Sequence, residues 1–234
     1  MQLSVRDVAK LLEVSEKSIY RWVKQGVLPA YRVADQYRFN RAELLDWATS
    51  RRMNVSSELV DEPESNATPI PSLTEELDTG GIFYRIEGAN QRSVLQSVVD
   101  HLRLPEEVDR DFLLRVLLAR EALQSTAVGD GIAIPHARNP VVLHVSRPQI
   151  ALCFLERPIE YGALDGKPVQ VLFGLISPTV RAHLRLLSRL AFALNDPAFK
   201  RVVLRVAARE AILREAKRVD SVLSGRRRPV VVRG

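Results

Sequence analysis

Cysteine and histidine are scarce in this sequence, and their scarcity limits the sites that the chain can build. Cys153 is the single cysteine among 234 residues, so the chain cannot form an internal disulfide. The four histidines are widely separated, and together with one cysteine they do not give the spacing of a zinc site. We therefore expect a protein that contains no metal and no cofactor.

Long apolar runs are also missing. No segment approaches the ~18 consecutive apolar residues of a transmembrane helix, and the N-terminus lacks the basic region and apolar run of a secretory signal. Hydrophobic residues make up 46% and charged residues 26% of the chain, which excludes collagen-like, coiled-coil and wholly disordered proteins. We expect a globular cytoplasmic protein without membrane contact.

The net charge of +6 is unevenly distributed. Residues 1–52 carry a net charge of +4, whereas residues 53–80 carry seven acids and neither Lys nor Arg. This acidic stretch includes three prolines and little apolar periodicity, so it cannot bury enough surface to offset the entropy of ordering. The sequence therefore predicts two domains, a linker and a basic tail, with the boundaries 1–52, 73–222, 53–72 and 223–234 respectively.

The first fifty residues show two short helical patterns separated by a tight turn. Ser4 and Ser15 stand where N-cap residues are favoured, Asp7 lies at the capping-box position, and Gly26 ends the second helix as a C′ residue. Apolar residues spaced for one buried face follow each cap, namely Val5, Val8, Ala9 and Leu12, then Ile19, Trp22 and Val23. This is a helix-turn-helix pattern whose second helix is basic and hydroxyl-rich on its outer faces.

An alternating segment after these helices predicts a β-hairpin wing. With a three-residue turn over 34–36, residue 33 would pair with 37, 32 with 38 and 31 with 39. Arg32 and Arg38 would then oppose each other, and a DNA phosphate between them would remove the cost of two adjacent like charges. A third helix follows, with Asn40 as its N-cap, Glu43 at the box position, and Leu44, Leu45, Trp47 and Ala48 on or beside its inner face.

These elements, in this order, resemble the excisionase/MerR-like winged-helix domain over about residues 2–50. The resemblance is carried by residues 3–12, 14–15, 19–22, 26–33 and 37–39, with Ala34-Asp35 in place of the usual wing glycine. It implies binding of double-stranded DNA, with the second helix in the major groove. The candidate DNA-binding residues are Ser18, Tyr20, Arg21, Lys24, Arg32 and Arg38. One such domain offers little contact area, so we expect a homodimer on DNA. A small helical protein-interaction module is the alternative.

The pattern from about Leu73 onwards mixes strands and helices. Continuous apolar runs over 149–155 and 169–176 are typical of strands that are buried on both faces, and Ile82 to Ile86 reads as a third strand. Helices are predicted over 93–101 and 109–123, after Asp196, after Arg209, and from a Ser177-Pro178 cap through Leu194. Strands covered by helices predict an α/β domain.

The candidate chemistry lies between Arg120 and Arg138. Gly129 and Gly131 allow the backbone to approach a ligand closely. A short apolar strand then leads to His136 directly after a proline, a position that suits an exposed nucleophile at a strand end. Arg120, Ser125 and Thr126 supply the donors that an anion needs.

This run resembles the fructose/mannitol-type enzyme IIA domain of the bacterial phosphotransferase system, including its nitrogen-regulatory branch, over about residues 73–220. The supporting pieces are 112–113, 120–121, 125–126, 129, 131–136, 158–159, 162–169, 183–187 and 190–191, and Ala127 replaces the usual glycine after Ser-Thr. The resemblance implies a mixed sheet flanked by helices, transfer of a phosphoryl group to His136, and flanking positions for Arg120 and His183.

The proposed transfer is chemically consistent with these residues. A neutral imidazole nitrogen is a competent nucleophile near pH 7. The phosphoryl oxygens would be neutralised by Arg120, by the hydroxyls of Ser125 and Thr126, and by N–H groups of the glycine loop, without a metal.

Together the two domains predict a DNA-binding transcriptional regulator that is phosphorylated on His136 by the phosphocarrier protein HPr or its nitrogen-branch counterpart. On this interpretation the chain is a phosphoryl-transfer component rather than a metabolic enzyme, and sensor or transport proteins are further candidate partners. Two alternatives stay open: a phosphocarrier enzyme IIA that passes its phosphoryl group to a sugar permease, and a protein-binding module that is not phosphorylated.

Overall fold

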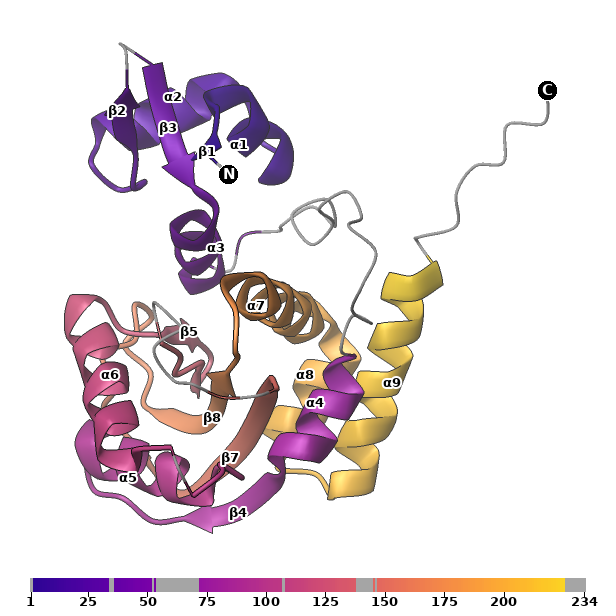
Figure 1. Ribbon diagram of the computed structural model, residues 1–234. Coiled ribbons are helices and arrows are strands. Elements are labelled where there is room, and N and C mark those ends of the chain that lie inside the picture. Colours follow the sequence, from indigo (N-terminus) through magenta and orange to yellow (C-terminus); the bar gives the residue numbers. More distant parts are fainter. Residues whose placement is uncertain are drawn as a thin grey trace.

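The computed structural model describes residues 2–33, 36–51, 53, 72–106, 108–137, 145 and 147–225, and places a small N-terminal unit on a larger C-terminal one (Figure 1). The small unit consists of β1 (Gln2–Leu3), α1 (Val5–Leu11), α2 (Glu16–Lys24), β2 (Tyr31–Val33), β3 (Gln36–Asn40) and α3 (Arg41–Ser50). The large unit consists of α4 (Leu73–Gly80), β4 (Ile82–Ile86), α5 (Gln91–His101), α6 (Arg110–Leu123), β5 (Ala127–Gly129), β6 (Ile132–Ala133), β7 (Gln149–Ile159), β8 (Val169–Ile176), α7 (Val180–Asn195), α8 (Pro197–Leu204) and α9 (Arg209–Gly225). Most of the predicted linker and tail lies outside the described residues, although α9 continues three residues into the predicted tail.

The caps predicted for the small unit are present. The Ser4 and Ser15 side chains accept hydrogen bonds from the backbone N–H groups of Asp7 and Ser18, and Ser4 and Asp7 form a complete capping box. Gly26 has the positive φ of +68° that a C′ residue needs. The apolar stripes of α1 and α2 then meet in one core, in which Val8 and Ile19 are fully buried. The helix-turn-helix prediction is confirmed.

The predicted wing register is wrong by one residue. β2 and β3 are antiparallel, but Tyr31 pairs with Arg38, Arg32 with Tyr37, and Val33 with Gln36. The two arginines therefore do not oppose each other, and the phosphate bridge predicted between them is lost with that register. β3 also pairs with β1, where Leu3 opposes the buried Phe39, so contacts on both sides of β3 set its position. The turn residues 34 and 35 lie outside the described residues.

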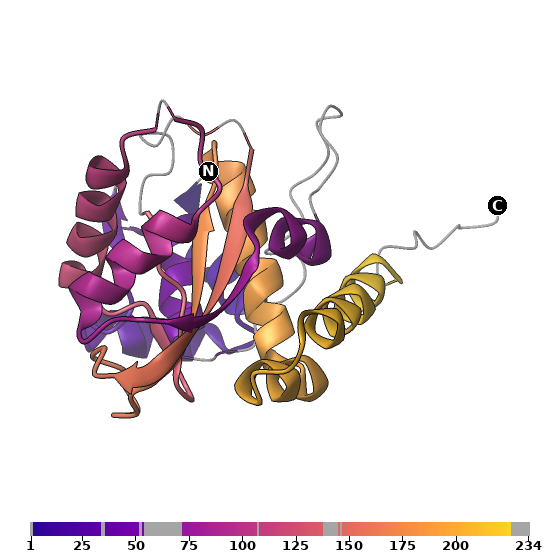
Figure 2. The same ribbon diagram turned by 90° about the horizontal axis from the view of Figure 1, so that it is seen from below.

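A mixed five-stranded sheet in the order β4-β7-β8-β6-β5 forms the centre of the large unit. β7 runs antiparallel to β8, whereas β4 is parallel to β7 and β6 is parallel to β8. Alternate residues of β7 enter two different cores: Ile150, Leu152 and Phe154 pack with α4, α7, α8 and α9, and Ala151, Cys153 and Leu155 pack with α5 and α6. The result is a sheet covered by helices on both faces, as Figure 2 shows, and the predicted α/β architecture is confirmed.

Three element boundaries differ from the sequence prediction. α5 begins at Gln91 because Asn90, rather than a later residue, accepts from the Ser93 N–H, and β7 continues to Ile159. α7 begins at Val180 with Thr179 as its N-cap, so Ser177 and Pro178 are not the first residues of that helix. Ser177 directly follows β8 and is fully buried. Thr179 provides the same kind of capping hydroxyl two residues later.

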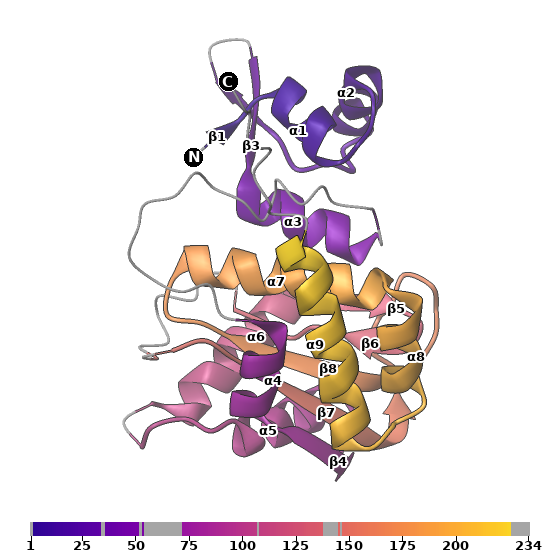
Figure 3. The ribbon, with the colours of Figure 1, turned by 90° about the vertical axis from the view of Figure 1, so that its right-hand side faces the viewer.

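The two units are in contact. α3 packs against α7 and β5, and the apolar residues of α3 belong to the same core cluster as those of α7 (Figures 1 and 3). Within the described ranges, no helix has the length and apolarity needed to cross a bilayer, and no three His, Cys, Asp or Glu side chains gather where they could hold a metal ion.

Candidate functional site

His136 lies beside the C-terminal end of β8. Its backbone continues the direction of β6 and bridges Leu175 in parallel, and the Leu175 N–H donates to the Pro135 carbonyl at 2.9 Å. The His136 side chain is 3% exposed, so the prediction of an exposed nucleophile is wrong for this conformation. The carboxyl ends of parallel β6 and β8 meet here, which is where open α/β sheets commonly bind ligands.

The tautomer of His136 follows from one contact. His136 Nδ1 lies 2.7 Å from the carbonyl oxygen of Ile134, two residues earlier in the chain. A carbonyl oxygen can only accept, so Nδ1 carries the proton and donates it. In the neutral ring Nε2 then holds the lone pair, so Nε2 is the ring atom that is able to act as a nucleophile.

The first turn of α7 faces this ring. His183 is the fourth residue of α7, is 3% exposed, and its ring centroid lies 5.2 Å from that of His136 with an interplanar angle of 45°. The structure therefore brings the two predicted histidines together. Backbone N–H groups at a helix N-terminus favour a negative charge, so this arrangement suits an anion beside His136.

The glycine loop predicted to bind phosphate forms a hairpin turn instead. Asp130 and Gly131 both have positive φ, 53° and 75°, which is the type I′ geometry that an Asp-Gly turn favours. The Asp130 carboxylate is paired with Lys167 at 2.9 Å and Lys200 at 2.6 Å. Since Ile132 pairs with Val171 and His136 with Leu175, this turn is about 13 Å from His136 at ~3.3 Å per residue. It is too distant to neutralise a phosphoryl group there.

Of the predicted donors, Arg120 lies in the last turn of α6, and Ser125 and Thr126 lie between α6 and β5. Arg120 is 9% exposed and its Nη1 donates to the Gln124 carbonyl at 2.7 Å. The Ser125 hydroxyl donates to the Tyr161 carbonyl at 2.7 Å, and the Thr126 hydroxyl donates to the Glu121 carboxylate. In this conformation the two hydroxyls therefore organise the protein around the site.

Sequence reasoning assigned no role to Glu121, which is at the centre of this network. Its carboxylate is 6% exposed and accepts from the Thr126 N–H at 2.9 Å, the Thr126 hydroxyl and the Tyr161 hydroxyl at 3.0 Å. Burial raises the pKa of Glu121, whereas hydrogen bonds from Thr126 and Tyr161 and the nearby His136 act in the opposite direction. Burial also raises the pKa of Tyr161. The signal was available, because Glu121 continues the buried stripe of Leu113 and Leu117 at four-residue spacing.

The outer face of α2 forms a second candidate site. A shallow hollow there is lined by Ser15, Lys17, Ser18, Tyr20, Arg21, Lys24 and Gln25. These residues include four of the six predicted DNA contacts, and Tyr20 also packs edge-on against Tyr37 of the wing at 6.1 Å between ring centroids. Cationic, hydroxyl and amide groups on one exposed helix match what a DNA groove requires.

The two predicted wing arginines are placed differently. Arg38 lies in β3, where it donates to the Gln36 side chain at 2.6 Å and to the Tyr37 carbonyl at 3.3 Å. Arg32 lies in β2, and its side chain is outside the described part of the chain. Arg38 is not among the residues that line the hollow over α2, so the α2 residues alone support this face as a binding site.

Comparisons with known proteins agree with both parts of the structure. The model for "Phosphoenolpyruvate-dependent sugar phosphotransferase system, EIIA 2" matches residues 76–218, and a helix-turn-helix domain model matches residues 3–52. The nitrogen regulatory protein of Pseudomonas aeruginosa is 37% identical over 127 residues, which are 53% of this chain and 80% of that protein. The fructose-specific EIIABC component of Bacillus subtilis is 32% identical over 145 residues, 60% of this chain but 22% of that longer protein.

A solved structure shows the same fold. The nitrogen regulatory protein IIA-Ntr from Neisseria meningitidis superposes with a TM-score of 0.52 and 27% identity, covering 64% of this chain and 98% of its own. The matched EIIA region spans more than half of the present chain. The chain therefore belongs to the EIIA 2 family of the phosphoenolpyruvate-dependent sugar phosphotransferase system, and it carries a helix-turn-helix domain in front of that region.

Proposed function

We propose that this protein is a DNA-binding transcriptional regulator whose EIIA domain accepts a phosphoryl group on Nε2 of His136. The observation that carries the proposal is the 2.7 Å contact of His136 Nδ1 with the Ile134 carbonyl, which leaves Nε2 with the lone pair. The donor in this proposal is the phosphorylated phosphocarrier protein HPr or its nitrogen-branch counterpart. The first turn of α7, with His183, supports the negative charge that the phosphoryl group brings.

The buried position of His136 has a consequence for this reaction. A phosphoryl group on Nε2 needs room that a ring 3% exposed and 5.2 Å from its neighbour does not offer. Transfer therefore requires a shift of the first turn of α7 or of the His183 side chain. Packed helices move as units rather than bending freely, so such a shift would also displace the C-terminal end of α7.

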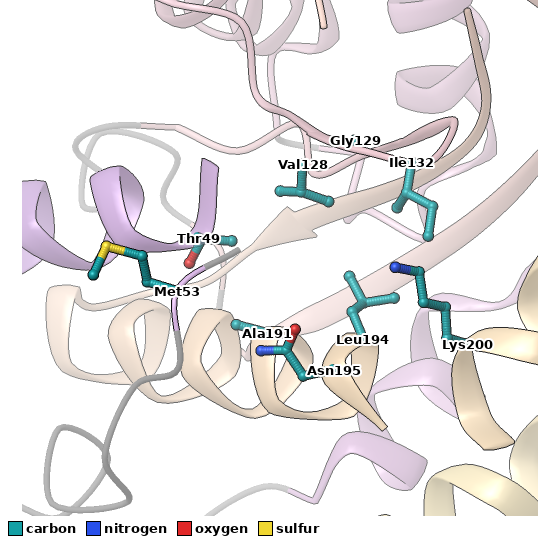
Figure 4. A pocket seen from close by; sticks show the side chains of 9 residues that line it. All are labelled: Thr49, Met53, Val128, Gly129, Ile132, Ala191, Leu194, Asn195 and Lys200. Atoms are coloured by element: carbon teal, nitrogen blue, oxygen red, sulfur yellow. The ribbon is translucent and has the colours of Figure 1, made fainter. Parts of the chain in front are cut away.

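We place the coupling between the domains in α7. Its far end lies about 18 Å from His183 at 1.5 Å per residue. There Ala191, Leu194 and Asn195 line a small cavity together with Thr49 and Met53 from the N-terminal side (Figure 4). Phosphorylation adds nearly two negative charges, but screening over ~10 Å makes direct repulsion of DNA weak. A change in the docking of α3 on α7 is the route that this packing supports.

A phosphoryl-transfer assay tests the proposal. The full chain is incubated with phosphorylated phosphocarrier, and we expect one acid-labile phosphoryl group per chain. His136→Ala should remove the label completely. His101→Ala is the matched control, since His101 Nδ1 also contacts a carbonyl at 2.7 Å, but on an exposed helix end. No label on the wild type, or equal label on His136→Ala, would refute the proposed phosphorylation.

DNA binding needs a separate assay. Arg21 and Lys24 line the outer face of α2, and we propose that this face enters the major groove, with two copies of the chain bound to one operator because one module offers little contact area. Affinity should fall steeply as salt increases, and a two-chain complex should form on DNA. Absent or salt-independent binding would refute this half of the proposal.

The similarity to a fructose-specific EIIABC component favours one alternative, a phosphocarrier that passes the group onward to a sugar permease. Adding a permease EIIB domain to the phosphorylated chain separates the two functions. Rapid loss of the label to EIIB would favour the carrier, whereas a stable label that changes DNA affinity would favour the regulator.

A further inference from the structure

We propose that Glu121 is a positioning residue for His136 and acts through three successive hydrogen bonds. The Glu121 carboxylate accepts from the Thr126 N–H at 2.9 Å. The Thr126 carbonyl accepts from the Ile134 N–H at 3.0 Å. The Ile134 carbonyl accepts from His136 Nδ1 at 2.7 Å. The inference rests on the proposed phosphoryl transfer and assigns to that site a residue that never touches the reacting atoms.

A carboxylate at this buried position destabilises the fold unless other groups compensate its charge. Glu121 is 6% exposed on the inner face of α6, where the loss of hydration destabilises the charged carboxylate unless hydrogen bonds compensate. Four donors converge on it: the Thr126 N–H, the Thr126 hydroxyl, the Tyr161 hydroxyl and, at 3.5 Å, the side-chain amide of Gln91. These donors come from three separate segments, so Glu121 joins the residue before β5 to the second residue after β7 and to the first residue of α5.

The position of Thr126 fixes the acceptor of the His136 proton. Thr126 and Ile134 are linked by the hydrogen bond between their backbones, so the place of Thr126 determines where the Ile134 carbonyl lies. That carbonyl selects the tautomer with the proton on Nδ1. By this path Glu121 keeps the lone pair on Nε2, the atom that attacks phosphorus.

The charge of Glu121 also fits the reaction. The Nε2 lone pair forms the new N–P bond, the bond between phosphorus and the donor breaks, and the donor keeps that electron pair. No proton leaves the His136 ring because Nδ1 retains its own, so the ring gains a positive charge. A buried negative charge on the same chain of hydrogen bonds stabilises that ring, as a buried carboxylate does behind a catalytic histidine.

The test uses the full chain, Glu121→Gln and the control Glu160→Gln, which makes the same charge change on an exposed neighbour of Tyr161. Two quantities are measured: the ¹⁵N chemical shifts of the His136 ring and the rate of phosphorylation by phosphorylated phosphocarrier. We expect the wild type and Glu160→Gln to hold the proton on Nδ1. In Glu121→Gln the proton should be shared between the two nitrogens, and the rate should fall roughly 10- to 100-fold.

Each outcome decides the inference. A folded Glu121→Gln variant with wild-type shifts would overturn it, whether or not its rate falls, because a merely structural role does not need the tautomer to change. Tyr161→Phe, which removes one of these donors, should move both readouts in the same direction by less. It replaces Glu121→Gln if that variant does not fold, and wild-type shifts in Tyr161→Phe would then overturn the inference. If the wild type takes no phosphoryl group, the proposed function fails, but the ¹⁵N shifts still decide the positioning role.

Discussion

The His136 site and the outer face of α2 differ in how far their charged and polar groups are exposed to solvent. At the first, His136, His183, Arg120 and Glu121 are all at most 9% exposed and are oriented by contacts within the protein. At the second, polar and cationic side chains line a hollow on the outer face of a helix, which is open to solvent. The first site therefore depends on geometry and is only weakly screened by salt, whereas the second depends on charge and is strongly screened. Substitutions in the buried region should change the stability of the fold, whereas substitutions on the α2 face should change the affinity for DNA.

Asp220→Ala should give the largest effect, a loss of stability of the large unit that contains the His136 site. Asp220 accepts from Arg189 at 2.9 Å and from the N–H groups of Leu73 and Thr74 at the start of α4, so it ties α9 to α7 and α4. Removing one partner of a buried ion pair costs about 3–5 kcal/mol, which urea unfolding would measure. Asp100→Ala, on an exposed helix face, is the control. A loss as small as that of the control would show that this network does not hold the large unit together.

Glu76→Gln should show a pH-dependent gain of stability in the same unit. Burial, with Glu75 nearby, raises the pKa of Glu76 from 4.5 to about 7. The proton is thus held more tightly in the folded state, so the stabilisation is full below pH ~4.5 and disappears as the pH rises through about 7. At pH 8 the variant should exceed the wild type by up to about 3 kcal/mol, and at pH 5 by little. Thermal unfolding at the two pH values measures this, and a pH-independent difference would contradict the assigned ionisation.

Arg21→Ala should weaken DNA binding without touching the fold. We expect a loss of about 1–2 kcal/mol and a salt slope that is smaller by about one if the contact is with phosphate. Fluorescence anisotropy at several salt concentrations measures both. Lys10→Ala, a cation on the exposed face of α1, is the control. Equal effects of the two substitutions would mean that general charge, and not the α2 face, governs binding.

Thr49→Val should give the smallest effect, and it tests whether α3 of the small unit packs on α7 of the large unit. Thr49 is 8% exposed, lines the cavity between α3 and α7 (Figure 4), and its hydroxyl makes no hydrogen bond to the described residues. An isosteric apolar side chain should therefore stabilise the docked chain by about 0.5–1 kcal/mol. A destabilisation would indicate that Thr49 is solvated and that α3 does not dock.

Local chemistry explains which parts of the fold could be predicted from sequence. N-cap side chains accept from backbone N–H groups two or three residues further on, so Ser4, Ser15, Asp109 and Asp196 predicted the starts of their helices correctly. The predicted wing register was wrong because a two-residue turn and a three-residue turn are both compatible with the alternating pattern of the strands. The register depends on the pairing of β3 with β1, which is a contact with the N-terminal residues of the domain.

At the His136 site, too, the local sequence predicted some features, whereas others depend on residues that are distant in the chain. A linear motif identified His136, and the helix that carries His183 was placed correctly apart from its first residues. The glycines were misassigned, since sequence does not say whether Gly-Asp-Gly is a hairpin turn or an anion loop; the lysines that pair with Asp130 come from 37 and 70 residues away. Glu121 was given no role because its spacing in α6 predicts burial but not the hydrogen bond from Tyr161, which is 40 residues distant.

The most direct measurement is ³¹P–¹⁵N NMR of the chain after incubation with phosphorylated phosphocarrier. Our account predicts a single phosphohistidine at position 136 with phosphorus on Nε2 and the proton kept on Nδ1. Phosphorus on Nδ1, on another histidine, or on none would contradict it.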